Sequence, residues 1–297
     1  MIEKGSNLEH FCTPESEKPD NFEKQFSEQE ELEFYGGKIE VTDITPEEQK
    51  TEVPIMIAPG WGENPITFKG SLRTIYDSDR RAISVSHARN MGQAEEEKNM
   101  PLVEVRKAKA LLTTIQEKEI DQIDVIAHSE GAINTIIAAS IHPEKFRNIV
   151  LVGPGGLIGK DSFPKLFTRF SLNIIKGALR ALIEPDTRDA IATSAKETGK
   201  YIRKNPLLAL KEAIAISESD IRNLINELRE QGIGVSIIHG VDDPVFPMDS
   251  MQDAVKGEEV DGFYSVKGGH NDIYANPDKY TKLAVQALDD LEKKKSL

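Results

Sequence analysis

The chain has 297 residues, of which 38% are hydrophobic and 29% are charged, a composition typical of a soluble globular protein with a large core. Its formal net charge of −13 argues against general nucleic-acid binding, which needs a positively charged face. No segment approaches the roughly 18 apolar residues of a membrane span, the first residues show no secretory signal, and a single cysteine, Cys12, excludes an internal disulfide framework. We therefore expect a cytoplasmic protein.

The N-terminal part of the chain contains a polar arm, a hairpin and a buried strand. Residues 1–31 are polar and acidic, and we expect a flexible arm there, with some helix and no chemistry. Residues 31–42 alternate around Gly36-Gly37, which predicts a β-hairpin. Residues 53–58 are predicted to form a buried strand, and this strand ends in the turn Pro59-Gly60-Trp61-Gly62.

Short buried strands then alternate with helices. Residues 82–86 and 146–152 have the apolar pattern of buried strands, and residues 102–117 have that of a helix. This alternation predicts an α/β fold with a mostly parallel sheet that is covered on both faces.

Between these strands lies the most informative stretch, Asp124-Val-Ile-Ala-His-Ser-Glu-Gly-Ala132. Val125 to Ala127 end a buried strand, and apolar residues resume at helical spacing from Ala132. Ser129 therefore lies on a sharp strand-to-helix turn, where small neighbours such as Gly131 let the two backbones pass closely. The backbone N–H of Glu130 then lies at a helix N-terminus, where a developing negative charge can be bound. The alternative is a serine that merely caps a helix.

After Gly156 the alternation stops, and residues 157–230 look helical, with helices expected near 163–183, 187–204 and 207–228. The first of these helices is amphipathic. Its apolar face contains Phe163, Phe167, Phe170, Ile174, Ala178 and Leu182, and its basic face contains Lys165, Arg169, Lys176 and Arg180.

Residues 160–204 contain ten Lys or Arg against five Asp or Glu, although the whole chain is acidic. Two hypotheses follow from this pattern. In the first, the apolar face covers a pocket for an acyl or aromatic group, and the basic face is simply solvated. In the second, the basic amphipathic helix contacts an anionic membrane surface or an anionic substrate. We favour the first hypothesis, because runs of charge are usually solvated faces.

Two late loops carry the remaining candidates. A strand at 233–238 leads into His239-Gly-Val-Asp-Asp-Pro244, in which Asp243 is the candidate acid, although a type I turn would use the same residues. A last strand at 262–266 leads into Gly268-Gly269-His270, before a closing helix near 278–292. Only its position distinguishes His270 from the chain's other histidines.

The chain resembles the α/β-hydrolase family in four features. They are the sequence A-H-S-E-G at 127–131, the turn after the first buried strand, the Asp243 loop and the late histidine. The usual G-x-S-x-G pattern has alanine at its first glycine here, which adds only a methyl group. The resemblance implies a nucleophile at Ser129, an acid at Asp243 and a base at His270. It also implies that the backbone N–H groups of Trp61 and Glu130 bind the oxyanion.

The same resemblance implies the organisation and the activity. A core of residues 32–156 and 231–297 would carry a helical cap at 157–230, in which Phe163, Phe167 and Phe170 contact the substrate. The expected activity is hydrolysis of a carboxylic ester or related acyl bond in a small molecule through an acyl-enzyme, with no metal and no organic cofactor. A serine-dependent acyltransferase and a non-catalytic binding module on the same fold remain alternatives.

Overall fold

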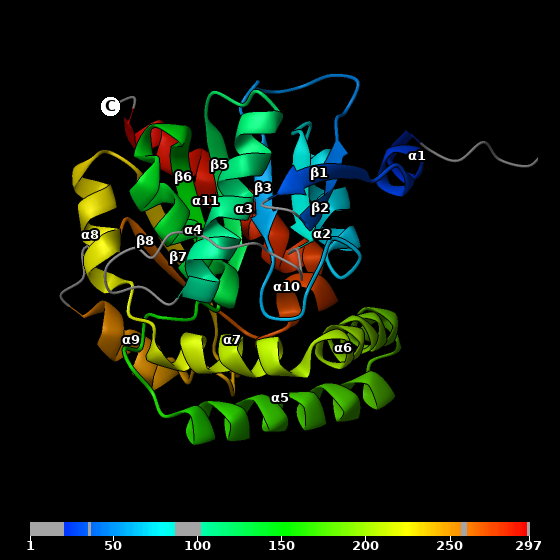
Figure 1. Ribbon diagram of the computed structural model, residues 1–297, viewed down its shortest axis with the longest axis vertical. Coiled ribbons are helices and arrows are strands. Elements are labelled where there is room, and N and C mark those ends of the chain that lie inside the picture. Colours follow the sequence, from blue (N-terminus) through cyan, green and yellow to red (C-terminus); the bar gives the residue numbers. More distant parts are fainter. Residues whose placement is uncertain (1–20, 35–36, 87–101, 257–259, 296–297) are drawn as a thin grey trace, which may run out of the picture.

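The computed structural model describes residues 21–34, 37–86, 102–256 and 260–295. Its centre is an eight-stranded sheet in the order β1-β2-β4-β3-β5-β6-β7-β8 (Figure 1). The strands are β1 (Glu30–Phe34), β2 (Gly37–Ile44), β3 (Ile55–Ala58), β4 (Ala82–Ser86), β5 (Ile123–His128), β6 (Phe146–Val152), β7 (Gly234–Gly240) and β8 (Gly262–Val266). Strand β2 is antiparallel to both of its neighbours, and all the other pairs are parallel. The predicted mostly parallel sheet is thus confirmed.

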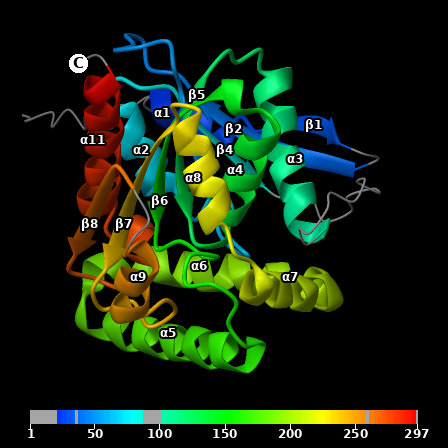
Figure 2. The same ribbon diagram turned by 90° about the vertical axis from the view of Figure 1, so that its left-hand side faces the viewer.

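Helices cover both faces of this sheet (Figure 2). On one side lie α3 (Leu102–Glu117), α4 (Glu130–Ile141) and α8 (Arg222–Glu230). On the other lie α1 (Asn21–Ser27), α2 (Lys69–Tyr76), α10 (Asp272–Ala275) and α11 (Pro277–Lys295).

The central strands are buried on both faces, which explains their continuous apolar sequences. In β5, Val125 and Ala127 join the core beneath α3 and α4, whereas Ile126 joins the core beneath α2 and α11. Because successive side chains of a strand point to opposite faces, such a strand must be apolar at every position.

Three helices form a separate layer over the carboxyl ends of the parallel strands (Figures 1 and 2). They are α5 (Phe163–Ile183), α6 (Pro185–Lys204) and α7 (Pro206–Glu218), and we refer to them as the helical layer. The two remaining helices are short, a 3-10 turn at Pro143–Lys145 and α9 (Met248–Val255).

The helix expected at 207–228 is two helices in the structure. Helix α7 ends at Glu218, and α8 begins at Arg222. Between them the buried Ile221 donates its backbone N–H to the carbonyl of Gly156 at 3.0 Å. Helix α8 then packs on α4 in the core, so the helical layer ends before residue 230. Apolar periodicity alone could not show this break, because both helices bury one face.

The N-terminal region also differs from the expected flexible arm. Helix α1 buries Phe22, whose ring stacks on Phe26 with centroids 5.8 Å apart and meets Tyr76 edge-on at 5.6 Å. Gln25 exchanges hydrogen bonds with the backbone of Thr45. Helix α1, part of the expected arm, is therefore held against the core by Phe22, Phe26 and Gln25, while the arm's first 20 residues lie outside the described part of the chain.

Candidate active site

Ser129 occupies a strained turn between β5 and α4. Its backbone angles are φ 52° and ψ −118°, which residues with a side chain rarely adopt. The Ser129 N–H donates to the carbonyl of Val152 at 3.1 Å, and its own carbonyl accepts the N–H of Gly155 at 2.9 Å. These two bonds hold the turn at the carboxyl edge of the sheet.

Gly131 makes this turn possible. A Cβ atom at this position would lie 2.3 Å from the carbonyl oxygen of Ala58 and 2.8 Å from that of Pro59. No side chain fits between the start of α4 and the end of β3. Ala127, by contrast, is accommodated in the core at the position where the family pattern has its first glycine.

The structure brings the three side chains singled out in the sequence into one hydrogen-bonded chain. His270 Nε2 lies 3.0 Å from Ser129 Oγ, and His270 Nδ1 lies 2.8 Å from Asp243 Oδ2. These residues follow β5, β7 and β8, whose carboxyl ends share one edge of the sheet. The neighbouring Asp242 is exposed and lies outside this chain of hydrogen bonds.

Asp243 is held in its ionised form. Its Oδ1 accepts the backbone N–H groups of Val245 at 2.7 Å and of Phe246 at 3.1 Å. Burial opposes ionisation, but the attraction and hydrogen bond of His270, with smaller contributions from His239 and the Phe246 N–H, lower the pKa of Asp243 below its usual value. The carboxylate can therefore orient His270 and stabilise its protonated ring.

The turns at Gly60-Trp61 and at Ser129-Glu130 carry the two backbone N–H groups expected to bind an oxyanion. The Gly60 N–H is occupied by Glu63 Oε2 at 2.7 Å. Within the described ranges, no intramolecular acceptor is found for the backbone N–H groups of Trp61 and Glu130. The turn approaches the serine closely, since a Cβ atom at Gly60 would lie 3.0 Å from Ser129 Cβ. Trp61 lines the pocket together with Ser129, and Glu130 is the next residue in the chain, so both residues lie close to the serine.

An almost wholly apolar pocket opens beside Ser129, between the sheet edge and the helical layer. Its lining includes the three predicted residues Phe163, Phe167 and Phe170, and it is completed by Trp61, Leu166, Ala213, Ile216, Val245 and Phe246. The ring of Trp61 meets Phe170 edge-on at 5.2 Å. This lining suits a hydrocarbon or aromatic group better than a charged one.

The inward face of α5 differs from the predicted one. Its buried residues are Leu166 and Asn173, and the Asn173 amide donates to Asn271 Oδ1 at 3.2 Å, beside His270. Ile174, Ala178 and Leu182, expected on the inward face, are exposed. Helix α5 has apolar side chains over more than half its circumference, so periodicity did not fix which strip turns inward.

His128, directly before Ser129, is fully buried between two parts of the site. Its Nε2 donates to the carbonyl of His270 at 3.0 Å, and its Nδ1 lies 2.8 Å from Glu63 Oε2. Burial lowers the pKa of His128, but the charge and hydrogen bond of Glu63 outweigh this effect and raise it overall. A protonated His128 can donate from both ring nitrogens, as this position requires.

Behind the turn lies a second buried ionic cluster. Lys107 Nζ donates to both carboxylate oxygens of Glu130 at 2.6 Å and lies 3.2 Å from Glu212 on α7. Glu212 also accepts the Tyr201 hydroxyl and, at 3.2 Å, the indole N–H of Trp61. Burial alone would lower the pKa of Lys107, but its anionic neighbours raise it well above the usual value. The cluster therefore connects the helical layer to both residues with available backbone N–H groups.

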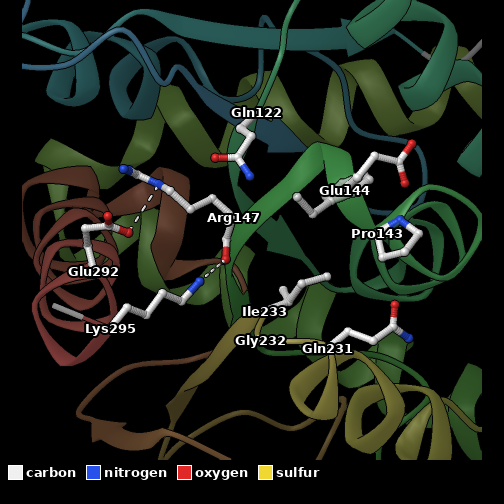
Figure 3. A pocket seen from close by; sticks show the side chains of 10 residues that line it. Gln122, Pro143, Glu144, Arg147, Gln231, Gly232, Ile233, Glu292 and Lys295 are labelled. Carbon is white, nitrogen blue, oxygen red and sulfur yellow. Dashed lines mark hydrogen bonds and ion pairs between the residues drawn. The ribbon is translucent and has the colours of Figure 1, made fainter. Parts of the chain in front are cut away.

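The described part of the chain has a further cavity away from the serine. A larger cavity lies at the opposite, amino-terminal edge of the sheet, lined by Arg147, Gln231, Glu292 and Lys295 among others (Figure 3). Arg147 is paired with Glu292 there, and Lys295 donates to the backbone carbonyl of Arg147. Among the described residues, no cluster of three or more His, Cys, Asp or Glu side chains could hold a metal ion. Within the same residues, no helix has the length and apolar character needed to cross a membrane.

Comparison with known proteins identifies the fold. No protein-family model matches the sequence, and no curated protein matches it. Among solved structures, an enol-lactonase from Burkholderia xenovorans LB400 is 13% identical, with a TM-score of 0.64 over 88% of this chain and 100% of its own. A bromoperoxidase from Bacillus anthracis is 15% identical, with a TM-score of 0.65 over 88% of this chain and 100% of the bromoperoxidase. A thermophilic esterase from Thermogutta terrifontis is 16% identical, with a TM-score of 0.63 over 89% of this chain and 99% of the esterase. The chain therefore has the α/β-hydrolase fold, which confirms the fold that the resemblance implied.

Several residues around the site were not singled out from the sequence. Glu63, Lys107 and Glu212 look like surface residues in a sequence, although each is buried. A signal existed for Lys107, which shares a helical stripe with Ala108, Leu111 and Ile115 and so faces the core. No comparable local signal marks Glu63 or Glu212, whose partners lie far away in the chain.

Proposed function

We propose that this protein is a serine hydrolase that cleaves a carboxylic ester or a related acyl bond through an acyl-enzyme on Ser129. The observation that most supports this proposal is the hydrogen-bonded chain from Ser129 Oγ through His270 to Asp243. Ser129 itself lies on a strained turn and lines the apolar pocket. The similar solved structures include an esterase and an enol-lactonase, which agrees with ester cleavage.

In the proposed mechanism, His270 Nε2 removes the Ser129 proton as Oγ attacks the acyl carbon. Asp243 keeps the second proton of the imidazole on Nδ1 and stabilises the imidazolium. The N–H groups of Trp61 and Glu130 bind the oxyanion, and removing one such donor commonly costs about 3–4 kcal/mol in the transition state. His270 then protonates the leaving group and later deprotonates the water that releases the acid.

The helical layer has the role of a cap in this proposal. Phe163, Phe167 and Phe170 hold the acyl group in the apolar pocket, while Glu212 and Tyr201 connect the cap to the turn that carries Trp61. The cap would then set the acyl chain length that the enzyme accepts, because it supplies most of the pocket's aromatic lining.

A direct test combines labelling with turnover. A fluorophosphonate probe should label the wild-type protein at Ser129 and leave Ser129→Ala unlabelled. A panel of p-nitrophenyl esters of increasing chain length should be hydrolysed by the wild type at least about 10⁴-fold faster than by Ser129→Ala. Ser140, whose hydroxyl donates to the carbonyl of Ile136 on α4, provides the control variant Ser140→Ala, which should keep its activity.

The outcomes separate the alternatives. Absence of labelling together with equal rates for wild type and Ser129→Ala would contradict the proposal and favour a binding module. Labelling with ester formation from an added alcohol, in place of hydrolysis, would identify an acyltransferase with the same acyl-enzyme.

A further inference from the structure

The helical layer exposes an unusual number of large apolar side chains. Of the twelve large hydrophobic side chains that are exposed in the described residues, seven lie on α5 and three on α6 and α7. Leu182 and Ile183 are 74% and 78% exposed. The ten side chains are Phe167, Leu172, Ile174, Ile175, Leu179, Leu182, Ile183, Ile202, Leu207 and Leu210. Phe167 also lines the pocket, and so many exposed apolar side chains on one helix are typical of an interaction site.

The exposed residues of α5 form an ordered stripe. Leu172, Ile175, Leu179 and Leu182 recur at the helical spacing i, i+3, i+7 and i+10. The stripe lies away from the buried Leu166 and Asn173, so one helix covers the pocket with one strip and presents another outward. Figures 1 and 2 both show α5 as the outermost helix of the layer, with α6 and α7 between it and the sheet.

Basic side chains border this stripe. Arg169 is paired with Asp161, and Arg180 with Glu184 and Asp272. Lys165 and Lys176 are exposed, and no acidic partner lies within ion-pair distance of either in the described part of the chain. The unpaired positive charges of α5 are therefore these two lysines, beside the stripe.

Charge favours a lipid surface over a second copy of the chain. Two copies that met through α5 would bring together two segments that each carry ten basic against five acidic residues at 160–204. An anionic bilayer would attract the same segment. Because charges are screened beyond roughly 10 Å, the remaining, strongly acidic part of the chain opposes this contact only weakly.

We propose that the apolar stripe of α5 docks on the surface of an anionic lipid bilayer, with Lys165 and Lys176 at the level of the phosphates. Helix α5 then lies in the plane of the interface, as amphipathic helices with basic flanks do. The docking is independent of acyl chemistry, so a variant without Ser129 retains it.

The test is co-sedimentation of the full chain with vesicles. Vesicles of equal parts phosphatidylcholine and phosphatidylglycerol should bind the protein at low salt and release much of it at high salt, whereas phosphatidylcholine vesicles should bind it weakly. The triple variant Ile175→Gln, Leu179→Gln, Leu182→Gln should bind at least about tenfold more weakly. Lys165→Gln and Lys176→Gln should each weaken binding to the anionic vesicles about fivefold.

Matched controls distinguish docking from general stickiness. Ile66→Gln and Val241→Gln remove exposed apolar side chains outside the layer and should leave binding unchanged. Ser129→Ala should also bind like the wild type, so loss of hydrolysis and loss of docking are separate results. Circular dichroism should show the wild-type unfolding curve for every variant other than Ser129→Ala, because the side chains substituted in them are exposed.

Two results would overturn the proposal. One is the absence of sedimentation with anionic vesicles at low salt. The other is a dimer, seen by light scattering, that the triple glutamine variant abolishes, which would show that a second copy covers the stripe.

Discussion

The Nδ1 atom of His128 lies 2.8 Å from Oε2 of Glu63, and both side chains are buried. The same carboxylate oxygen accepts the Gly60 N–H at 2.7 Å, and the other ring nitrogen of His128 donates to the carbonyl of His270 at 3.0 Å. This pair therefore connects the turn after β3 to the loop that carries His270. Neither residue contacts the Ser129 hydroxyl, yet both fix the backbone around it.

The pair predicts a pH-dependent contribution to stability. Because the folded-state pKa of His128 is raised, its contribution is fully present below the unfolded value of about 6.5 and is lost as the pH rises through the folded value. Glu63→Gln should lower the free energy of unfolding by about 1–3 kcal/mol at about pH 6, and by less at about pH 9. Urea unfolding of both proteins across this range measures the difference.

An exposed pair provides the control for this experiment. His142 Nδ1 lies 3.0 Å from Glu144, but both side chains are more than half exposed. Glu144→Gln should therefore change the unfolding free energy very little at any pH. A Glu63→Gln effect that stays constant or grows with pH would contradict a protonated His128.

Asp243→Asn should lower ester hydrolysis by about 10³- to 10⁴-fold while the fold is retained. Two backbone N–H groups bind Oδ1 of Asp243, so an asparagine must keep its oxygen there and turn its NH₂ group toward His270 Nδ1. His270 would then carry its proton on Nε2 and could not accept one from Ser129. Rates with a p-nitrophenyl ester check this, and Asp242→Asn should remain close to wild type because Asp242 is exposed.

Lys107→Met should destabilise the protein by about 3–5 kcal/mol, because it leaves Glu130 and Glu212 buried without their cation. Chemical unfolding measures this loss. Lys256, whose pair with Asp253 at 2.9 Å is exposed, is the matched control, and Lys256→Met should have almost no effect. Equal stability of the two variants would show that the buried cluster does not depend on its lysine.

Gly131→Ala should cost about 3 kcal/mol or more, since the new methyl group must displace the end of β3 from its 2.3 Å contact. Gly199 lies inside α6, and no atom comes within 4 Å of a Cβ built there. Gly199→Ala should therefore be neutral or stabilise by up to about 1 kcal/mol, because alanine favours helix. Thermal unfolding measures the stability of both variants, one with the added methyl group in the crowded turn and one with it at an uncrowded helix position.

Much of the fold follows from local sequence patterns. The strands at 82–86, 146–152 and 262–266 and the helix at 102–117 have the same bounds in the structure as in the sequence-based prediction. Strands buried on both faces must be apolar throughout, and helices on a sheet must be apolar on one side, so both leave clear periodicities. The residues of the hydrogen-bonded chain stood out for a similar reason, since each lies within a few residues of the end of such a strand.

The sequence alone established the alternation of buried strands and helices and the order of serine, aspartate and histidine along the chain. Only the tertiary structure decided which strip of α5 faces the pocket, that α8 belongs to the core, and that Glu63, His128, Lys107 and Glu212 are buried partners. The physical reason is the distance along the chain between the residues that interact. Periodicity and turn geometry are set by residues a few positions apart, whereas a buried charge is stabilised by a partner that can lie more than a hundred residues away.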